Sequence, residues 1–267
     1  MKSDGIYHAL WVGDSIPALA AGCLASFVRL GHRVQLYTYD DLAGVPKGVE
    51  VLDAATILGR ERIFRHHRTG TLSVFSDHFA YTLLYKFGGT WIDCDMYCVR
   101  PVPGDEEILY GREAPDRLNK SLFRLPKGSD IAHDLLGVFE HRQSHLPWLL
   151  PSTRRRAWLR HHLLRKPYYQ IIPVATTGPA AFTYFLEQRG LDRLAKDTDV
   201  FCSLSFDDAL RITQADYDES CFLTDNSLAV HLWNDVQRFK TSPPQPGSLF
   251  ARIEEEGRGG PPAIDIA

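Results

Sequence analysis

The order of apolar segments near the start of the chain constrains its fold more than any other feature. Residues 6–12 are an apolar run typical of a buried strand, and residues 16–30 carry apolar side chains at helical spacing up to Gly31. Residues 33–39 then alternate as a half-buried strand does. Strand, helix and strand in this order predict a βαβ unit, and therefore an α/β protein. Residues 13–15 are expected to form the turn that caps the helix.

Later segments continue this alternation. Helices are predicted over residues 72–87, 130–142 and 178–188, and short strands over residues 90–93, 97–102, 107–110 and 228–233. From Pro243 onward the chain is rich in Pro and Gly, so residues 241–267 are predicted to form a tail with little core.

Composition excludes several classes of protein. A chain of 267 residues with 44% hydrophobic residues can bury a core without covalent cross-links. A net charge of −3 argues against nucleic acid as the main partner. The longest weakly polar run, residues 16–28, is shorter than the roughly 20 residues that span a membrane. Without a recognisable signal peptide, and with five widely spaced cysteines, the chain is expected to be cytoplasmic with reduced thiols.

One stretch has a strongly uneven charge. Residues 141–186 contain seven Lys or Arg and no Asp or Glu. Within residues 154–166 these charges are interleaved with Trp158 and several leucines. A solvated basic helix accounts for the pattern, and so does a surface for anionic lipid or a phosphorylated acceptor. The second alternative predicts peripheral contact with the inner membrane face through residues 154–166.

The stretch from residue 76 to residue 102 carries the clearest chemical signal. Asp93-Cys94-Asp95 follows a short apolar strand, and Gly88-Gly89 permits a tight turn before that strand. Because side chains alternate along a strand, both carboxylates can lie on one side while Cys94 points into the core. Paired carboxylates suit Mg²⁺ or Mn²⁺, which can neutralise a departing diphosphate. An exposed acidic turn is the alternative.

These motifs resemble those of the bacterial glycosyltransferases with a DXD sugar-binding motif, family 32 by sequence. Relatives include capsular polysaccharide synthesis enzymes, α-1,4-galactosyltransferases and α-1,6-mannosyltransferases. The resemblance covers residues 6 to about 240. It implies a GT-A-like fold, a mixed central sheet flanked by helices, in one catalytic domain over residues 1–240. The nucleotide-sugar half would span about 1–110 and the acceptor half about 111–240.

The resemblance also implies an activity and roles for individual residues. The activity is metal-dependent, retaining transfer of a sugar from a UDP- or GDP-linked donor to a glycan or lipid-linked acceptor, with Mn²⁺ or Mg²⁺ as cofactor. The implied roles are donor binding by Trp11, Gly13, Asp77, Gly89 and Asp93, catalysis by Asp93 and Asp95, metal binding by Asp93, Asp95 and His231, and acceptor-side positions at Gly178, Pro179, Trp233 and Asn234. Trp11 would stack on the base.

Simpler roles remain open for several of these residues. Trp11 could be a core aromatic side chain, Asp77 a helix cap and His231 a hydrogen-bonded core histidine.

One position departs from the pattern. Relatives carry an arginine where this chain has Ala80, three residues after Asp77. Arginine supplies a fixed charge and paired hydrogen bonds that alanine lacks. Either the donor pocket differs, another cation substitutes, or activity is low. Two other functions therefore stay open: a non-catalytic nucleotide-sugar-binding protein, and a Mg²⁺-dependent phosphohydrolase with Asp93 as nucleophile and Asp95 as acid/base.

Overall fold

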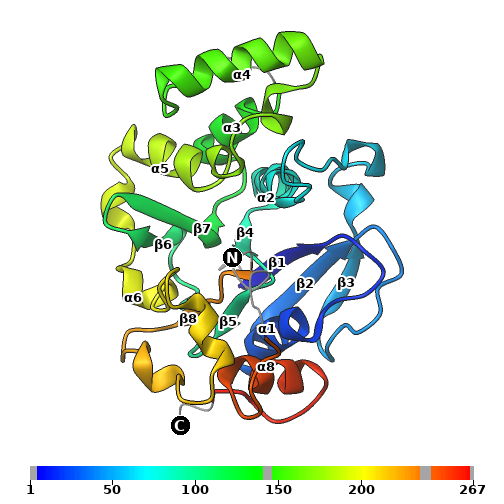
Figure 1. Cartoon of the computed structure of the whole chain (residues 1–267), viewed down its shortest axis with the longest axis vertical. Helices are drawn as coiled ribbons and strands as arrows, with labels where there is room; N and C mark the ends of the chain where they lie inside the picture. The colour runs from blue at the N-terminus through cyan, green and yellow to red at the C-terminus, as the bar shows by residue number, and fades with distance from the viewer. Residues whose placement is uncertain (1–4, 141–145, 235–241, 265–267) are drawn as a thin grey trace.

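A six-stranded mixed sheet forms the centre of the protein (Figure 1). The computed structural model describes residues 5–140, 146–234 and 242–264. Neighbouring strands β3, β2, β1 and β4 run parallel, and β7 is antiparallel to both β4 and β6. In sheet order the strands are β3 (Glu50–Asp53), β2 (Arg33–Thr38), β1 (Ile6–Trp11), β4 (Gly89–Ile92), β7 (Arg117–Leu125) and β6 (Leu109–Ala114). The predicted mixed α/β sheet is confirmed.

The first βαβ unit forms as the sequence predicts. Helix α1 (Ala18–Arg29) connects β1 to β2, and the chain leaves it through Gly31, whose φ of 84° lies in the left-handed region that favours glycine. The expected side-chain cap from residues 13–15 is wrong. The helix begins after Pro17 without a side-chain cap, and the backbone of Ser15 bridges to Ala43 instead.

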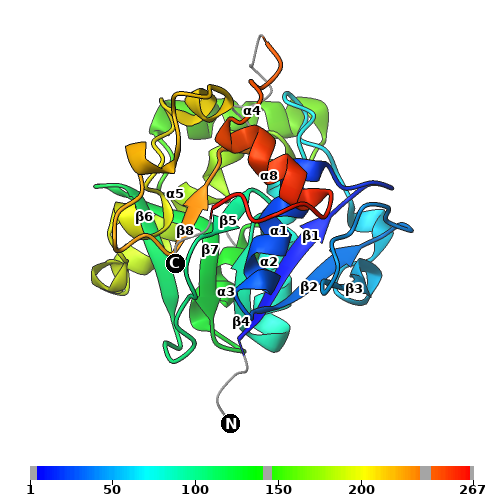
Figure 2. The same cartoon turned by 90° about the horizontal axis from the view of Figure 1, so that it is seen from below.

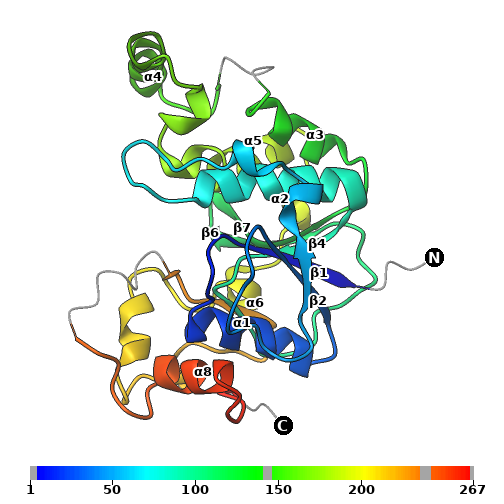
Figure 3. The same ribbon diagram turned by 90° about the vertical axis from the view of Figure 1, so that its right-hand side faces the viewer.

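Helices cover both faces of the sheet, as Figure 3 shows. Helices α2 (Ser73–Phe87), α3 (Asp130–Gly137) and α5 (Pro179–Glu187) cover one face. Helix α1 covers the other face, and α8 (Leu249–Gly257) packs on α1. Helix α4 (Pro151–Leu164) stands beyond α3 and α5, and a short helix, α6 (Thr198–Phe201), contacts β6. The predicted helix over residues 130–142 ends at Gly137, and residues 141–142 lie outside the described ranges.

The turn from α2 into β4 depends on two glycines. Gly88 and Gly89 have φ angles of 71° and 104°. A Cβ on Gly88 would lie 2.7 Å from the backbone nitrogen of Lys127, and one on Gly89 would lie 2.8 Å from Nε2 of His8. Larger residues would therefore disturb both the turn and the start of β4.

The segment predicted to be a Pro/Gly-rich tail, residues 241–267, contains structure instead. Ser248 caps α8 by accepting a hydrogen bond from the backbone of Ala251. Leu249, Phe250 and Ile253 of this helix are buried, as is Ile264 after it. Figure 2 shows α8 lying along α1. The expectation of little core is wrong because a short amphipathic run lies between the Pro- and Gly-rich stretches that dominate the composition.

Within the described ranges, no helix is both long enough and apolar enough to cross a membrane.

Candidate functional site

The Asp93-Cys94-Asp95 segment forms a tight turn at the carboxyl end of β4. The backbone nitrogen of Met96 donates to the carbonyl oxygen of Asp93 at 3.1 Å, which closes the turn. Strand β5 (Met96–Cys98) follows and pairs with β8 (Ala229–His231). Both are shorter than the strands predicted there. The expectation that strand alternation places both carboxylates on one side is wrong, because the strand ends at Ile92 and the turn aims Asp93 and Asp95 at different partners.

A buried ammonium group lies between two carboxylates on one side of this turn. Nζ of Lys120, from β7, is 2.9 Å from Oδ1 of Asp77 and 3.2 Å from Oδ2 of Asp93. Nε1 of Trp91 donates to Oδ1 of Asp93 at 2.8 Å. The hydroxyl of Thr177 donates to Oδ2 of Asp77 at 2.7 Å. The side chain of Asp77 therefore lies in the site and does not cap α2.

These contacts determine the charge state of Lys120. Burial alone would lower its pKa, but the carboxylates of Asp77 and Asp93 outweigh this effect and raise the pKa well above its usual value. Burial raises the pKa of Asp77, and the adjacent ammonium opposes that rise. Lys120 is therefore a permanent cation at neutral pH, fixed where α2, β4 and β7 meet.

The other side of the turn holds an ion pair between Asp95 and His231. Nε2 of His231 lies 3.3 Å from Oδ2 of Asp95 and 3.2 Å from the hydroxyl of Ser121. Burial would lower the pKa of His231, but Asp95 outweighs it and raises the pKa to about 10. In turn, His231 lowers the pKa of Asp95 against the effect of burial. The carboxylate of Asp95 therefore favours the protonated ring, and His231 is both buried and hydrogen-bonded.

The residues after β8 complete this second cluster. Trp233 has a φ of 53°, which is unusual for a bulky residue, and its ring centroid lies 4.1 Å from that of His231. Nε1 of Trp233 donates to the carbonyl oxygen of Leu204 at 2.9 Å. The backbone nitrogen of Asn234 donates to Oδ2 of Asp95 at 2.8 Å. The left-handed turn thus directs a backbone donor at the second carboxylate of the motif.

Gly178 lies beside the first cluster. A Cβ on this glycine would lie 3.2 Å from Oδ2 of Asp77 and 3.4 Å from Cε of Lys120. Pro179 occupies the first position of α5, where its missing N–H costs nothing. Three of the predicted acceptor-side residues therefore lie at the carboxylate site. Gly178 lies beside Asp77, Trp233 beside His231, and Asn234 donates to Asp95.

The remaining predicted donor residues separate into two groups. Trp11 ends β1, and its Nε1 donates to the carbonyl oxygen of Ser15 at 2.8 Å. Gly13 lies beside the Trp11 ring. Because β1 pairs with β4 in parallel, Trp11 is at the same sheet edge as the carboxylate turn, and Sγ of Cys94 lies 3.5 Å from the carbonyl oxygen of Leu10. Gly89 begins β4 at the opposite end of the strand, so the structure does not bring it to the site.

Three side chains at this turn are of the types that bind a divalent cation. Asp93, Asp95 and His231 have the ligand chemistry that Mn²⁺ or Mg²⁺ accepts. The turn supplies the two carboxylates, and β8, which pairs with β5 directly after the turn, supplies His231. Across the described residues, however, no three His, Cys, Asp or Glu side chains already converge on one point. The three carboxylates and two protein cations leave one net negative charge. The residues therefore fit a cation in type and charge, and His231 must lose its proton to become a ligand.

Sequence reasoning missed Lys120 and Ser121, and it did not predict the contact of Thr177 with Asp77. Lys120 and Ser121 are consecutive on β7 and point to opposite sides of the turn, one toward Asp93 and the other toward His231. Half of residues 118–125 are polar, so no local pattern in the sequence singles out Lys120. One explanation for Ala80 is that another cation takes the place of the arginine. Lys120, from β7, places such a cation beside Asp77.

Comparison with known proteins establishes the fold. No protein-family model and no curated protein matches this sequence. Among solved structures, the ligand-free glycosyltransferase domain from the YGT toxin aligns with 99% of this chain and 94% of its own, at a TM-score of 0.51 and 8% identity. The PaToxG glycosyltransferase aligns with 99% of this chain and 80% of its own, at a TM-score of 0.44 and 11% identity. The expected GT-A-like fold is confirmed, and membership of family 32 stays a prediction.

Proposed function

We propose that this protein is a glycosyltransferase that moves a sugar from a UDP- or GDP-linked donor to a glycan or lipid-linked acceptor. The position of the Asp93-Cys94-Asp95 turn carries the proposal. Strand β1 has β2 as its neighbour on one side and β4 on the other. The chain passes from β1 through α1 to β2 and later returns to β4, so the strand order reverses between β1 and β4. In open α/β sheets ligands bind at the carboxyl ends of the strands beside such a point.

The charges of the site support a divalent cation at this turn. With one net negative charge among its five charged side chains, the site would repel a nucleotide diphosphate. Asp93, Asp95 and His231 would hold Mn²⁺ or Mg²⁺. The ion, when bound, would supply positive charge to the departing diphosphate.

The protein's own side chains have separate tasks in the proposed reaction. Lys120 holds Asp77 and Asp93 in place from a fixed, buried position. Trp11 would stack on the nucleotide base, and Gly178 keeps the space beside Asp77 open. The bond between the sugar C1 and the diphosphate oxygen breaks, and a bond from C1 to an acceptor hydroxyl oxygen forms. The hydroxyl proton passes to the departing diphosphate oxygen, and the nucleotide diphosphate is released. We expect the α configuration of the donor to be retained.

We propose that residues 154–166 contact the cytoplasmic face of a membrane. Leu150, Leu159 and Leu163 are 72%, 51% and 72% exposed, beside the exposed Arg155 and Arg156. Exposed leucines beside basic side chains would contact anionic lipid through both apolar burial and charge, and a lipid-linked acceptor would lie at such a surface.

A nucleotide screen with one matched variant tests the proposal. Thermal unfolding is recorded with UDP, GDP and their sugar derivatives, with and without Mn²⁺. We expect a shift for one nucleotide class only when Mn²⁺ is present, because ligand at 100 times its dissociation constant adds about 2.7 kcal/mol of stability. Asp95→Asn should remove most turnover, and Asp225→Asn, in an exposed turn, is the control.

The outcomes separate the three functions. Near-normal turnover by Asp95→Asn would refute the metal role. A Mn²⁺-dependent shift without transfer to any acceptor would favour a non-catalytic binding protein, which the substitution of arginine by Ala80 suggests. No shift, together with release of phosphate from simple esters, would favour a phosphohydrolase.

A further inference from the structure

An arginine-lined cavity lies beside α4 and shares no residue with the carboxylate turn. Its volume is about 370 Å³, within the roughly 300–1,000 Å³ of small-molecule sites. Three guanidinium groups line it, together with polar side chains and a short apolar wall. The polar lining includes Arg68, Arg156, Arg160, His66, Thr69 and Thr153, and residues 171–174 form the apolar wall. We call this site the arginine cavity.

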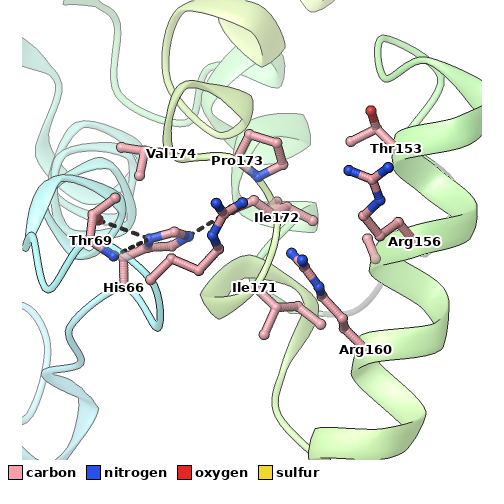
Figure 4. A pocket seen from close by; sticks show the side chains of 11 residues that line it. His66, Thr69, Thr153, Arg156, Arg160, Ile171, Ile172, Pro173 and Val174 are labelled. Atoms are coloured by element: carbon pink, nitrogen blue, oxygen red, sulfur yellow. Dashed lines mark hydrogen bonds between the residues drawn. The ribbon is translucent and has the colours of Figure 1, made fainter.

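Two elements hold the polar side chains toward the cavity. Arg156 and Arg160 are four residues apart on α4 and therefore share one face of that helix. In Figure 4 both extend from α4 toward the segment of Ile172 and Pro173. On the opposite side, Nε2 of His66 lies 2.8 Å from the carbonyl oxygen of Ile172, and Nδ1 lies 2.9 Å from the Thr69 hydroxyl. The buried His66 thus connects the loop of Thr69 to the apolar wall at Ile172.

The charge of the arginine cavity is unbalanced. Among the described residues, Arg68, Arg156 and Arg160 make no ion pair, and no carboxylate lines the cavity. Exposed arginines elsewhere do find acidic partners, as Arg60 does with Asp40 at 2.6 Å. Guanidinium groups bind phosphate oxygens through paired hydrogen bonds, and hydroxyls such as that of Thr153 add further donors. The cavity therefore has the chemistry of a site for a phosphate or diphosphate ester.

One short segment of the chain contributes to both the arginine cavity and the carboxylate site. Val174 lies three residues before Thr177, which donates to Asp77. At about 3.6 Å per extended residue, their Cα atoms are at most about 11 Å apart. A ligand with its phosphate in the cavity could therefore extend a sugar toward the turn.

We propose that the arginine cavity binds a phosphate or diphosphate ester carried by the acceptor of the transfer reaction. The assignment to the acceptor rests on the proposed glycosyltransferase function, whereas anion binding by the cavity does not. The same chemistry is found in a lipid-linked diphosphate sugar and in a water-soluble sugar phosphate.

Titration with inorganic pyrophosphate tests the cavity itself. Calorimetry in EDTA at low ionic strength keeps the negatively charged carboxylate site out of the measurement. We expect Arg156→Gln and Arg160→Gln each to weaken pyrophosphate binding at least fivefold. The control is Arg155→Gln, which removes the same charge from the same helix without lining the cavity, and its binding should change less than twofold. Equal losses in all three variants, or no binding by the wild type, would overturn the proposal.

Competition identifies the source of the phosphate. Displacement of pyrophosphate by a polyprenyl diphosphate sugar in micelles, but not by glucose 1-phosphate, supports a lipid-linked acceptor, and the reverse supports a soluble one. If neither displaces it, the acceptor assignment is wrong. Equal binding of phosphatidylglycerol vesicles to wild type and to Arg156→Gln, without pyrophosphate binding, would make α4 a membrane surface and refute the cavity.

Nucleotide binding distinguishes failure of this inference from failure of the proposed function. Arg156→Gln should leave the Mn²⁺-dependent nucleotide shift unchanged and raise KM for a phosphorylated acceptor without lowering kcat. Pyrophosphate binding without any nucleotide shift would preserve the anion site and reject the donor site. A nucleotide shift without pyrophosphate binding would support the donor site and reject the anion site.

Discussion

Replacing Lys120 by methionine should destabilise the protein far more than removal of a surface ion pair does. The Lys120 side chain is 12% exposed and that of Asp77 is 3% exposed, so the substitution leaves a buried carboxylate without its nearest cation. At an effective dielectric constant of about 20, unit charges 2.9 Å apart attract by roughly 6 kcal/mol, and desolvation offsets part of this. Loss of one partner from a buried pair costs about 3–5 kcal/mol.

The control is Lys196→Met. Its ammonium lies 2.8 Å from Glu106, but the two side chains are 36% and 32% exposed. An exposed pair contributes about 0–1 kcal/mol. Lys120→Met should therefore lower the free energy of unfolding, measured by urea titration, by at least about 2 kcal/mol more than Lys196→Met. Equal effects would show that the buried ammonium does not stabilise the carboxylates around it.

A double variant tests the reason for the effect. In Lys120→Met with Asp77→Asn, the buried carboxylate becomes a neutral amide of nearly the same shape. This protein should be more stable than Lys120→Met alone, although the amide still needs partners. If the second substitution gives no recovery, the cost of Lys120→Met comes from packing, and the electrostatic argument fails.

Burial lowers the pKa of His8 and His78 from 6.5 to about 4, so between these pH values the two side chains bind protons mainly in the unfolded chain. Their contribution to stability should therefore fall as pH decreases from about 6.5 to about 4. His78→Phe should flatten the urea-measured pH profile, and an unchanged slope would contradict this cause. Gly257→Ala should destabilise by more than about 2 kcal/mol because the added Cβ would overlap the carbonyl oxygen of Ala18, whereas Gly104→Ala, with open space around it, serves as the control. EDTA should abolish the nucleotide-induced thermal shift without lowering the melting temperature of the free protein, and a shift that survives chelation would argue against a metal-held diphosphate.

Local sequence signals predicted the first half of the fold well. The βαβ unit, the α2 helix and the Gly88-Gly89 turn each follow from spacing and from residues with specific backbone preferences. Strand β7 was missed because Lys120 and Arg124 interrupt its apolar pattern. Arg124 is buried and hydrogen-bonded to Thr90, and Lys120, 12% exposed, pairs with Asp77. Polar residues satisfied by distant partners cannot be recognised as core from local periodicity.

The candidate site was predicted in its parts and not in its arrangement. The motif around Asp93 and Asp95 indicated carboxylates at a strand end, and the structure places them there. It did not indicate that the two would face separate cations, because Lys120 and His231 come from β7 and β8, remote in sequence. The resemblance implied donor binding by Gly89, but the length of β4 separates this residue from the turn.

The contact between α1 and α8 has a consequence for how the protein is made. Glu256 accepts hydrogen bonds from Arg29 and from Tyr97, residues synthesised long before it. During translation the face of α1 that later contacts α8 stays uncovered until nearly all of the chain described here has left the ribosome. Contacts between such distant residues slow folding and leave apolar surface open to aggregation in the meantime. A chain interrupted before residue 249 should therefore be a substrate for chaperones and proteases, even though its sheet and carboxylate turn are already synthesised.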